Sequence, residues 1–266
     1  MKHALIFALS LFLSPVAAQA ADVVILGEVH DNPAHHMVQA GAVSANDPAA
    51  LVFEMLTPAQ AELVTPDLLN DENALRAALD WDNSGWPDFA IYYPIFAAAG
   101  ALANPSRIYG AQVPRSDARA AMQAGLVATF GADSVAYGLS APLDADQQTA
   151  REALQMTAHC DALPVDLLPA MVDVQRLRDA TLARATINAL DDTATDEAAG
   201  RVLVITGNGH ARKDWGVPAY LARLRPDLAV TSLGQSEGGA IDGGFDLILP
   251  AAPVDRPDPC EAFRKG

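Results

Sequence analysis

Short apolar runs separated by long amphipathic stretches dominate the pattern of hydrophobic and polar positions along the chain. The runs lie at Val23–Leu26, 51–54, 108–112, 202–206, 229–233 and 245–249. Apolar runs without polar alternation are typical of strands that are buried on both faces of a parallel sheet. The pattern therefore predicts an α/β fold with a three-layer, mostly parallel sheet core.

The stretches between these runs are helical in composition. Residues 33–45 form a crossover helix of ordinary length, whereas the gaps at about 56–105 and 115–195 are too long to be loops. Inside the two gaps the pattern predicts helices at 56–70, 71–80, 88–103, 115–130, 144–159 and 166–190, the last with Asp166 as its N-cap. We expect these two insertions to form a helical cap, with a cleft between the cap and the strand ends.

Residues 1–20 have the composition of a secretory signal peptide. Lys2 is followed by an apolar stretch that is too short for a stable membrane helix, and small residues precede a cleavage site expected after Ala20. A lipoprotein would need a cysteine at that position, and the first cysteine is Cys160. The sequence therefore predicts a single domain over residues 21–266 that is exported to the periplasm without stable membrane insertion.

Charge and cysteine content narrow the functional classes. The formal net charge is −16, so the phosphates of nucleic acids and the surface of anionic membranes would be repelled. The chain has two cysteines, Cys160 and Cys260. In an oxidising compartment such a pair favours one disulfide over two buried thiols.

Two similar tetrads follow two of the predicted strands. Gly27-Glu28-Val29-His30 comes after the first run, and Gly207-Asn208-Gly209-His210 comes after the run at 202–206. Ligands bind outside the carboxyl ends of parallel strands, and glycine lets a ligand approach the backbone closely. We therefore expect Glu28, His30 and His210 to line a common pocket.

Other polar residues near strand ends are candidates for the same pocket. His36 is expected to face His30 across the turn into the first helix, whereas His35 is expected to be exposed or to cap that helix. Glu54 ends the second run and is either a site residue or a helix-cap acceptor. Arg115, after the third run, is either a clamp for a carboxylate or phosphate or an ordinary surface charge.

A helix face and an aromatic segment each have two possible interpretations. Gln175, Arg178 and Asp179 share one helix face, which either reaches into the cleft or is solvated. Lys213 lies close to His210 and would suit an anionic ligand. The aromatic segment at 81–94 is either a flat binding wall or a packing hub, and composition favours the hub.

The ordered set of these residues resembles the ChaN-like haem-binding proteins of bacterial envelopes, within the Tiki/TraB/erythromycin-esterase-like group. The resemblance rests on Gly27-Glu28-Val29-His30, His35-His36, Phe53-Glu54-Met55, Trp86-Pro87-Asp88-Phe89, Val113-Pro114-Arg115, His159-Cys160, Gln175, Arg178-Asp179, Gly207-Asn208-Gly209-His210 and Arg256-Pro257-Asp258-Pro259-Cys260. It implies an EreA/ChaN-like α/β core with helical additions, haem as the cofactor, and a role in haem or iron acquisition.

The resemblance also implies roles for individual residues. In that family a tyrosine ligates the haem iron, and this position corresponds to Tyr92, with the adjacent Tyr93 as the alternative. Histidine and lysine hold the propionates, which makes His36, His210 and Lys213 candidates here. Pairs of haems at a dimer interface imply a homodimer that forms on haem binding.

The competing hypothesis is a hydrolase of the protease or esterase kind. Glu28 or His30 would act as a general base towards water, with His210 opposite, either with or without a divalent metal. A serine nucleophile is disfavoured because the chain has no Gly-x-Ser-x-Gly elbow. A purely structural envelope protein ranks last because it leaves the clustering of histidines unexplained.

Overall fold

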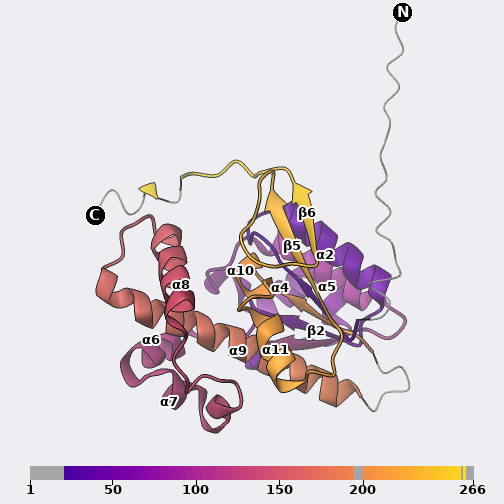
Figure 1. The fold of residues 1–266 in the computed structure, drawn as a ribbon. Helices are drawn as coiled ribbons and strands as arrows, with labels where there is room; N and C mark the ends of the chain where they lie inside the picture. The colour runs from indigo at the N-terminus through magenta and orange to yellow at the C-terminus, as the bar shows by residue number, and fades with distance from the viewer. Residues whose placement is uncertain (1–20, 195–199, 259, 262–266) are drawn as a thin grey trace, which may run out of the picture.

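A six-stranded parallel sheet forms the centre of the computed structural model, which describes residues 21–194, 200–258 and 260–261. The predicted signal peptide lies outside the described residues. The strand order is β3-β2-β4-β1-β5-β6, and every pairing is parallel, where the sequence predicted a mostly parallel sheet. Figure 1 shows this sheet, with β2, β5 and β6 labelled. The bounds are β1 Val23–Leu26, β2 Ala50–Phe53, β3 Arg107–Gly110, β4 Val202–Ile205, β5 Val230–Glu237 and β6 Leu247–Ala251.

The register of the central strands brings the two tetrads together. Leu26, the last residue of β1, is paired with Ile205 at the end of β4. Phe53, the last residue of β2, is paired with the same Ile205 from the other side. The residues that follow β1, β2 and β4 therefore leave the sheet at one edge, side by side.

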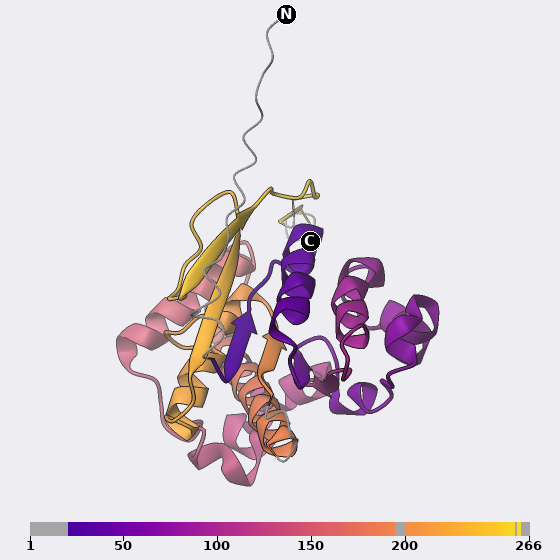
Figure 2. The same cartoon turned by 90° about the vertical axis from the view of Figure 1, so that its right-hand side faces the viewer.

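Helices cover both faces of the sheet, so the predicted three-layer architecture is confirmed. Alternate strand residues point to opposite faces: Val24 and Leu26 join one apolar core, and Val23 and Ile25 join the other. The first core is covered by helices that precede β3 in the chain, and the second by helices that follow it (Figure 2). The covering helices are α2 (Pro33–Asn46), α4 (Glu72–Ala78) and α5 (Phe89–Gly100) on the first core, and α6 (Arg115–Ala124), α7 (Leu126–Phe130), α9 (Leu168–Thr193) and α11 (Val217–Leu224) on the second.

Three of the helix predictions need correction. The helix predicted at 56–70 is instead a short α3 (Pro58–Ala61), a loop and a 3-10 turn at Leu68–Asn70, because Thr57 caps α3 and Pro66 interrupts the stretch. The helix predicted at 115–130 is broken into α6 and α7 by Gly125, whose φ is 91°. Asp166 does not cap α9, because it lies within a preceding 3-10 turn at Val165–Leu167.

One element that the sequence analysis did not predict, a short helix after β4, matters for the site. A short helix, α10 (Asn208–Ala211), begins directly after β4, so His210 is held on a helical turn. The helix α8 (Ala145–Ala158) was predicted, and it packs on α9 away from the sheet. No helix among the described residues is both long and apolar enough to cross a bilayer.

The end of the chain returns to the first tetrad. The predicted disulfide between Cys160 and Cys260 is confirmed, which ties the end of the described chain to the second insertion. Between β6 and this disulfide, the guanidinium of Arg256 donates to both carboxylate oxygens of Asp31 at 2.8 Å and to both of Glu237 at 2.7 Å. Asp31 follows His30, so this segment braces the turn that carries His30.

Candidate functional site

Side chains from the ends of three neighbouring strands meet in one cleft. His30 follows β1, Glu54 follows β2, and His210 follows β4. All three line a cleft of about 380 Å3, together with Ser84, Gly85, Trp86, Ala111, Gln112, Val113, Arg115 and Arg178. The cleft thus lies at the carboxyl edge of the sheet, and residues from both long insertions complete its wall.

Glu28 is the buried anchor of the first half of this site. Its side chain is 0% exposed, and three groups donate to it. The Nδ1–H of His30 and the hydroxyl of Tyr92 each lie 2.8 Å from Oε1, and the amide of Gln39 lies 2.7 Å from Oε2. Burial opposes the charge, but the neighbouring His30 and His36 rings outweigh it and lower the pKa of Glu28 below its ordinary value. Glu28 is therefore an anion that fixes the orientation of His30.

His35 and His36 are parts of this buried support and do not contact the cleft. Contrary to the expectation of an exposed or capping residue, His35 is fully buried and its Nδ1 accepts the backbone N–H of Val29 at 2.9 Å. His36 is also 0% exposed, lies 3.4 Å from Oε1 of Glu28 and packs against the ring of Tyr92. The rings face inward because Asn32 and Pro33 begin α2 immediately after the tetrad, which turns this part of the helix against the sheet.

A second carboxylate–histidine pair forms the other half of the site. The Nδ1 of His210 lies 2.6 Å from Oδ1 of Asp179 on α9, and the amide of Gln175 lies 3.1 Å from the same nitrogen. On its other side, Nε2 of His210 is 3.4 Å from Oε1 of Glu54. Glu54 is held in place because the hydroxyl of Thr206 and the N–H of Gly207 donate to its Oε2 at 2.7 and 2.8 Å.

These contacts set the protonation states of the second pair. Burial disfavours the imidazolium, but the carboxylates of Glu54 and Asp179 outweigh it and raise the pKa of His210 to about 10. Burial likewise opposes ionisation of Glu54, yet the His210 charge holds the pKa of Glu54 well below its usual range. Burial raises the pKa of Asp179. At neutral pH the pair therefore carries a histidinium between two acidic groups.

The two halves meet at Gly207. A Cβ on Gly207 would lie 2.9 Å from Nε2 of His30 and 3.7 Å from Oε2 of Glu54, so a glycine is needed for this close approach. The side chain of His30 is 35% exposed, and its ring packs edge-on against Trp86 at 4.9 Å between centroids. Burial disfavours the charged form of His30, but the hydrogen bond to Glu28 and the charge of Glu54 outweigh burial. The pKa of His30 is therefore raised above its ordinary value.

Two arginines at the cleft carry unpaired positive charge. Arg115 begins α6 and Arg178 lies on α9, and neither side chain has an ion pair or hydrogen bond within the described part of the chain. The buried Nε1 of Trp86 also has no hydrogen-bond partner among the described residues. The cleft therefore combines an aromatic side chain, spare donors and two free cations, which suits a flat apolar ligand with carboxylates.

Four residues predicted to contact a cofactor do not line this cleft. Tyr92 and His36 are both buried in the apolar core, so a ligand cannot reach them in this conformation. Tyr93 is half-buried against Phe89 on α5 and is not among the residues of the cleft wall. Lys213 forms an ion pair with Asp246 instead of facing the site. Within the aromatic segment, Trp81 and Tyr92 pack in the apolar core, as the packing-hub interpretation predicts, whereas Trp86 lines the cleft.

The remaining candidates line the cleft or contact a residue that lines it. Glu54, which was either a site residue or a cap acceptor, lines the cleft. The face of α9 with Gln175, Arg178 and Asp179 reaches the site and is not merely solvated. Within residues 21–194, 200–258 and 260–261, no group of three or more His, Cys, Asp or Glu side chains is arranged to hold a metal ion.

The structure has relatives among solved proteins. It superposes on ChaN of Campylobacter jejuni, described for its cofacial haem binding, with a TM-score of 0.59 and 21% sequence identity over 85% of this chain and 86% of that one. The type III effector HopBA1 is more distant, with a TM-score of 0.44 and 13% identity over 90% of this chain and 92% of that one. No curated protein sequence matches the chain.

The sequence also matches the model of one protein family. The match covers residues 16–221, which is more than half of the 266 residues, and the family is described as haem-binding uptake, Tiki superfamily, ChaN. The resemblance inferred from the ordered motifs is thus confirmed. The chain belongs to the ChaN family of haem-binding uptake proteins within the Tiki superfamily.

Proposed function

We propose that this protein binds haem and serves in haem or iron acquisition. The observation that carries the proposal is that a chain of the ChaN haem-binding uptake family presents, at the carboxyl edge of its sheet, a cleft with Trp86 in its wall and two arginines that have no partner within the described residues. Haem is a flat apolar macrocycle with two carboxylates, and it supplies an iron centre for ligation or transport. The donors present in the cleft suit that ligand.

In this proposal Arg115 and Arg178 bind the propionates and Trp86 packs against the porphyrin. His30 is the iron ligand, because its Nδ1 is bound to the carboxylate of Glu28 while its Nε2 has no hydrogen bond among the described residues. A histidine whose second nitrogen donates to a carboxylate is the usual arrangement of a metal-binding imidazole. Tyr92, the ligand implied by the family resemblance, would first have to leave Glu28.

Hemin titration, followed by the intensity of the Soret band, tests whether Arg115 and Arg178 bind the propionates. Arg115→Gln and Arg178→Gln are each expected to weaken hemin binding several-fold, and the double variant more strongly. Arg119→Gln, exposed on the same helix as Arg115 and outside the cleft wall, is the matched control. An unchanged affinity in the double variant would contradict binding in this cleft.

The iron ligand is tested with His30→Ala, Tyr92→Phe and Tyr93→Phe. The Soret position and the charge-transfer bands of the ferric complex should change in His30→Ala and stay the same in Tyr93→Phe. If the spectrum changes in one of the tyrosine variants and not in His30→Ala, the ligand is that tyrosine and the assignment to His30 is wrong.

We further propose a periplasmic location and a homodimer formed on haem binding. The disulfide between Cys160 and Cys260 supports an oxidising compartment. The small cleft leaves part of a porphyrin uncovered, which a second copy would shield. Cell fractionation with N-terminal sequencing tests export and cleavage after Ala20, and light scattering with and without hemin tests the dimer.

A second candidate function is hydrolysis, and one observation favours it. The site holds two carboxylate–imidazole pairs, Glu28–His30 and Asp179–His210, and haem binding alone does not require the second. His30 would take a proton from water, and the cationic His210 would stabilise negative charge that develops on the substrate. Turnover of ester and peptide substrates that is lost in Asp179→Asn while hemin affinity is kept would support it. Metal analysis of the same preparation tests whether a divalent ion takes part.

A further inference from the structure

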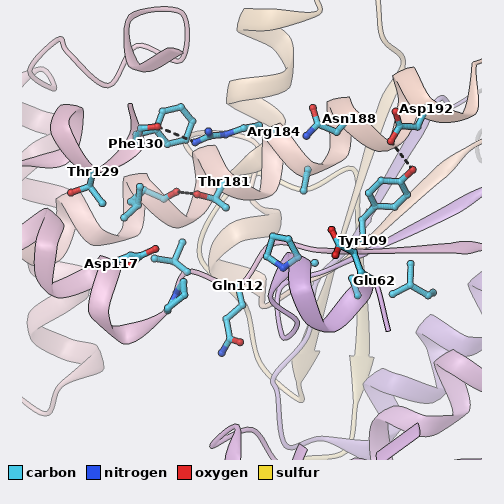
Figure 3. Close-up of a pocket in the computed structure, with 18 residues that line it drawn as sticks. Glu62, Tyr109, Gln112, Asp117, Thr129, Phe130, Thr181, Arg184, Asn188 and Asp192 are labelled. Carbon is cyan, nitrogen blue, oxygen red and sulfur yellow. Dashed lines mark hydrogen bonds between the residues drawn. The ribbon is translucent and has the colours of Figure 1, made fainter. Parts of the chain in front are cut away.

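A second pocket, of about 650 Å3, opens along the free edge of β3 (Figure 3). It shares Gln112 and Val113 with the wall of the cleft, but its other lining residues come from β3, α3, α6, α7 and α9. Neither the haem proposal nor the hydrolase alternative uses it. Its position relative to the sheet indicates what it could hold.

The β3 strand is an edge strand whose outer backbone groups face this pocket. It pairs with β2 only, and the N–H groups of Arg107 and Ala111 donate to the carbonyls of Ala49 and Phe53 on that side at 2.9 Å. Alternate residues of a strand bond to the same neighbour, so the N–H and C=O groups of Ile108 and Gly110 point away from β2. These groups are available to another strand.

The pocket has the shape of a vacant strand position between two helical layers. On one side, Pro58 and Ala61 of α3 form an apolar wall. On the other side α9 contributes a row of side chains, and Figure 3 shows this row facing Gln112 and Asp117 across the pocket. The row consists of Thr181, Arg184, Asn188 and Asp192. A strand placed beside β3 would therefore be covered on both faces, as parallel strands usually are.

The charges of the pocket select its occupant. Glu62 and Asp117 line it as exposed carboxylates, and Asp192 adds a third. The cation in the wall, Arg184, is stacked on the ring of Phe130 at 3.6 Å and donates to its backbone carbonyl. In a chain with a net charge of −16, these carboxylates favour a basic partner.

We propose that this pocket binds an extended, basic segment of a partner protein as a seventh strand beside β3. Successive side chains of a strand alternate between its faces. Side chains of one set would lie against the row of α9, and those of the other set would lie against Pro58 and Ala61. Basic side chains of the segment would pair with Glu62, Asp117 and Asp192, and its apolar side chains would cover Pro58 and Ala61. The backbone of the segment would pair with Ile108 and Gly110. This mode of recognition is strand addition to an exposed sheet edge.

The probe for this proposal is a fluorescein-labelled peptide of alternating lysine and valine, and the comparison is a glutamate–valine peptide of the same length. Fluorescence anisotropy should show binding of the first and not of the second. The double variant Glu62→Gln, Asp117→Asn should weaken binding at least about tenfold. Asp166→Asn with Asp242→Asn, two exposed carboxylates outside the pocket lining, removes the same charge and should leave affinity unchanged.

Backbone pairing is tested at Ile108. Ile108→Pro removes an N–H that does not donate to β2 and is expected to abolish binding, whereas Ile108→Val keeps the N–H and should bind as the parent does. Circular dichroism checks that the proline variant is folded. In the unmodified protein, hydrogen exchange at the amides of Ile108 and Gly110 should slow on addition of the lysine–valine peptide.

Three results would each overturn the proposal. They are absence of binding by the lysine–valine peptide, equal binding of the two peptides, and binding without added protection of the Ile108 and Gly110 amides. The hemin spectra of the Glu62 and Asp117 variants should match the parent, because neither residue lines the haem cleft. The peptide-binding and hemin-binding measurements therefore test the two proposals independently.

Discussion

The Nδ1 atom of His210 lies 2.6 Å from Oδ1 of Asp179, a fully buried carboxylate in the middle of the longest helix. The histidine comes from the strand-end tetrad after β4, and the aspartate comes from the second insertion. The insertion is therefore part of the site as well as a covering layer. Removal of the Asp179 carboxylate should therefore change the pKa of His210 more than that of any other group.

The substitution Asp179→Asn is expected to lower the pKa of His210 from about 10 towards the ordinary histidine value. One of the two carboxylates that hold the imidazolium is then neutral, while the burial that disfavours the charge is unchanged. NMR titration of the His210 ring gives the pKa directly. Asp166→Asn, an exposed aspartate before the same helix, should leave it unchanged. An unaltered His210 titration in Asp179→Asn would contradict the pairing.

Stability should fall on the alkaline side of neutrality. The pKa of His210 in the folded protein, about 10, lies above the ordinary value of 6.5, so its contribution is fully present below about pH 6.5 and is lost as the pH rises through 10. The slope for one group is at most about 1.4 kcal/mol per pH unit. Denaturant unfolding at a series of pH values measures it. His210→Gln should flatten this limb, and a limb of the same slope in that variant would exclude His210 as its source.

The sheet was predictable because its central strands β1, β2 and β4 are buried on both faces. Runs such as Val23–Leu26 and 202–206 have no polar alternation, and the structure reproduces them within a residue or two. Helix boundaries were less predictable. Gly125 ends α6 through a backbone conformation that apolar periodicity does not report, and the loop after α3 follows from Thr57 and Pro66.

The site was only partly predictable for a related reason. Strand ends bring His30, Glu54 and His210 to one cleft. Glu28 was expected to line the same cleft, but it is buried behind His30. The direction of a side chain on a helix depends on tertiary contacts, which the sequence pattern does not show. For this reason Tyr92 and His36 were expected to contact the haem, whereas in the structure both are buried behind Glu28. The clamp of Arg256 on Asp31 was missed because it joins residues 225 positions apart.

The substitution Gly207→Ala should impair the cleft without unfolding the sheet. The new Cβ would lie 2.9 Å from Nε2 of His30, so the imidazole has to shift. Hemin affinity should fall at least about tenfold, because a ligand or base displaced by even an ångström loses most of its effect. The matched control is Gly41→Ala at an exposed position of α2, where a Cβ meets nothing within 4 Å and stability should stay the same or rise. Parent-like hemin binding in Gly207→Ala would show that His30 is not part of the haem site.

The substitution Tyr92→Phe should cost stability more than it costs binding. The phenol donates to a buried carboxylate at 2.8 Å, and its loss leaves Glu28 with one fewer partner. Hydrogen bonds to charged groups contribute about 1.5–3 kcal/mol, so the free energy of unfolding should fall by about that amount. Tyr93→Phe, on the half-buried neighbour, should change it by less than about 0.5 kcal/mol. Equal effects in the two variants would mean that the Glu28 bond is not what Tyr92 supplies.

Removal of the disulfide should lower the stability of the fold without releasing the turn that carries His30. The bond between Cys160 and Cys260 closes a loop with a sequence separation of 100, and such a bond stabilises a protein by about 2–4 kcal/mol. Cys160→Ser with Cys260→Ser should lower the free energy of unfolding by that amount.

The effect on hemin affinity should be small while Arg256 still holds Asp31, so Arg256→Met alone should reduce affinity more than the double serine variant does. Hydrogen exchange at the amides of His30 and Asp31 separates the two contributions, because it should rise in Arg256→Met and stay near the parent level in the serine variant. The reverse order of effects would mean that the disulfide, and not the arginine clamp, positions the histidine.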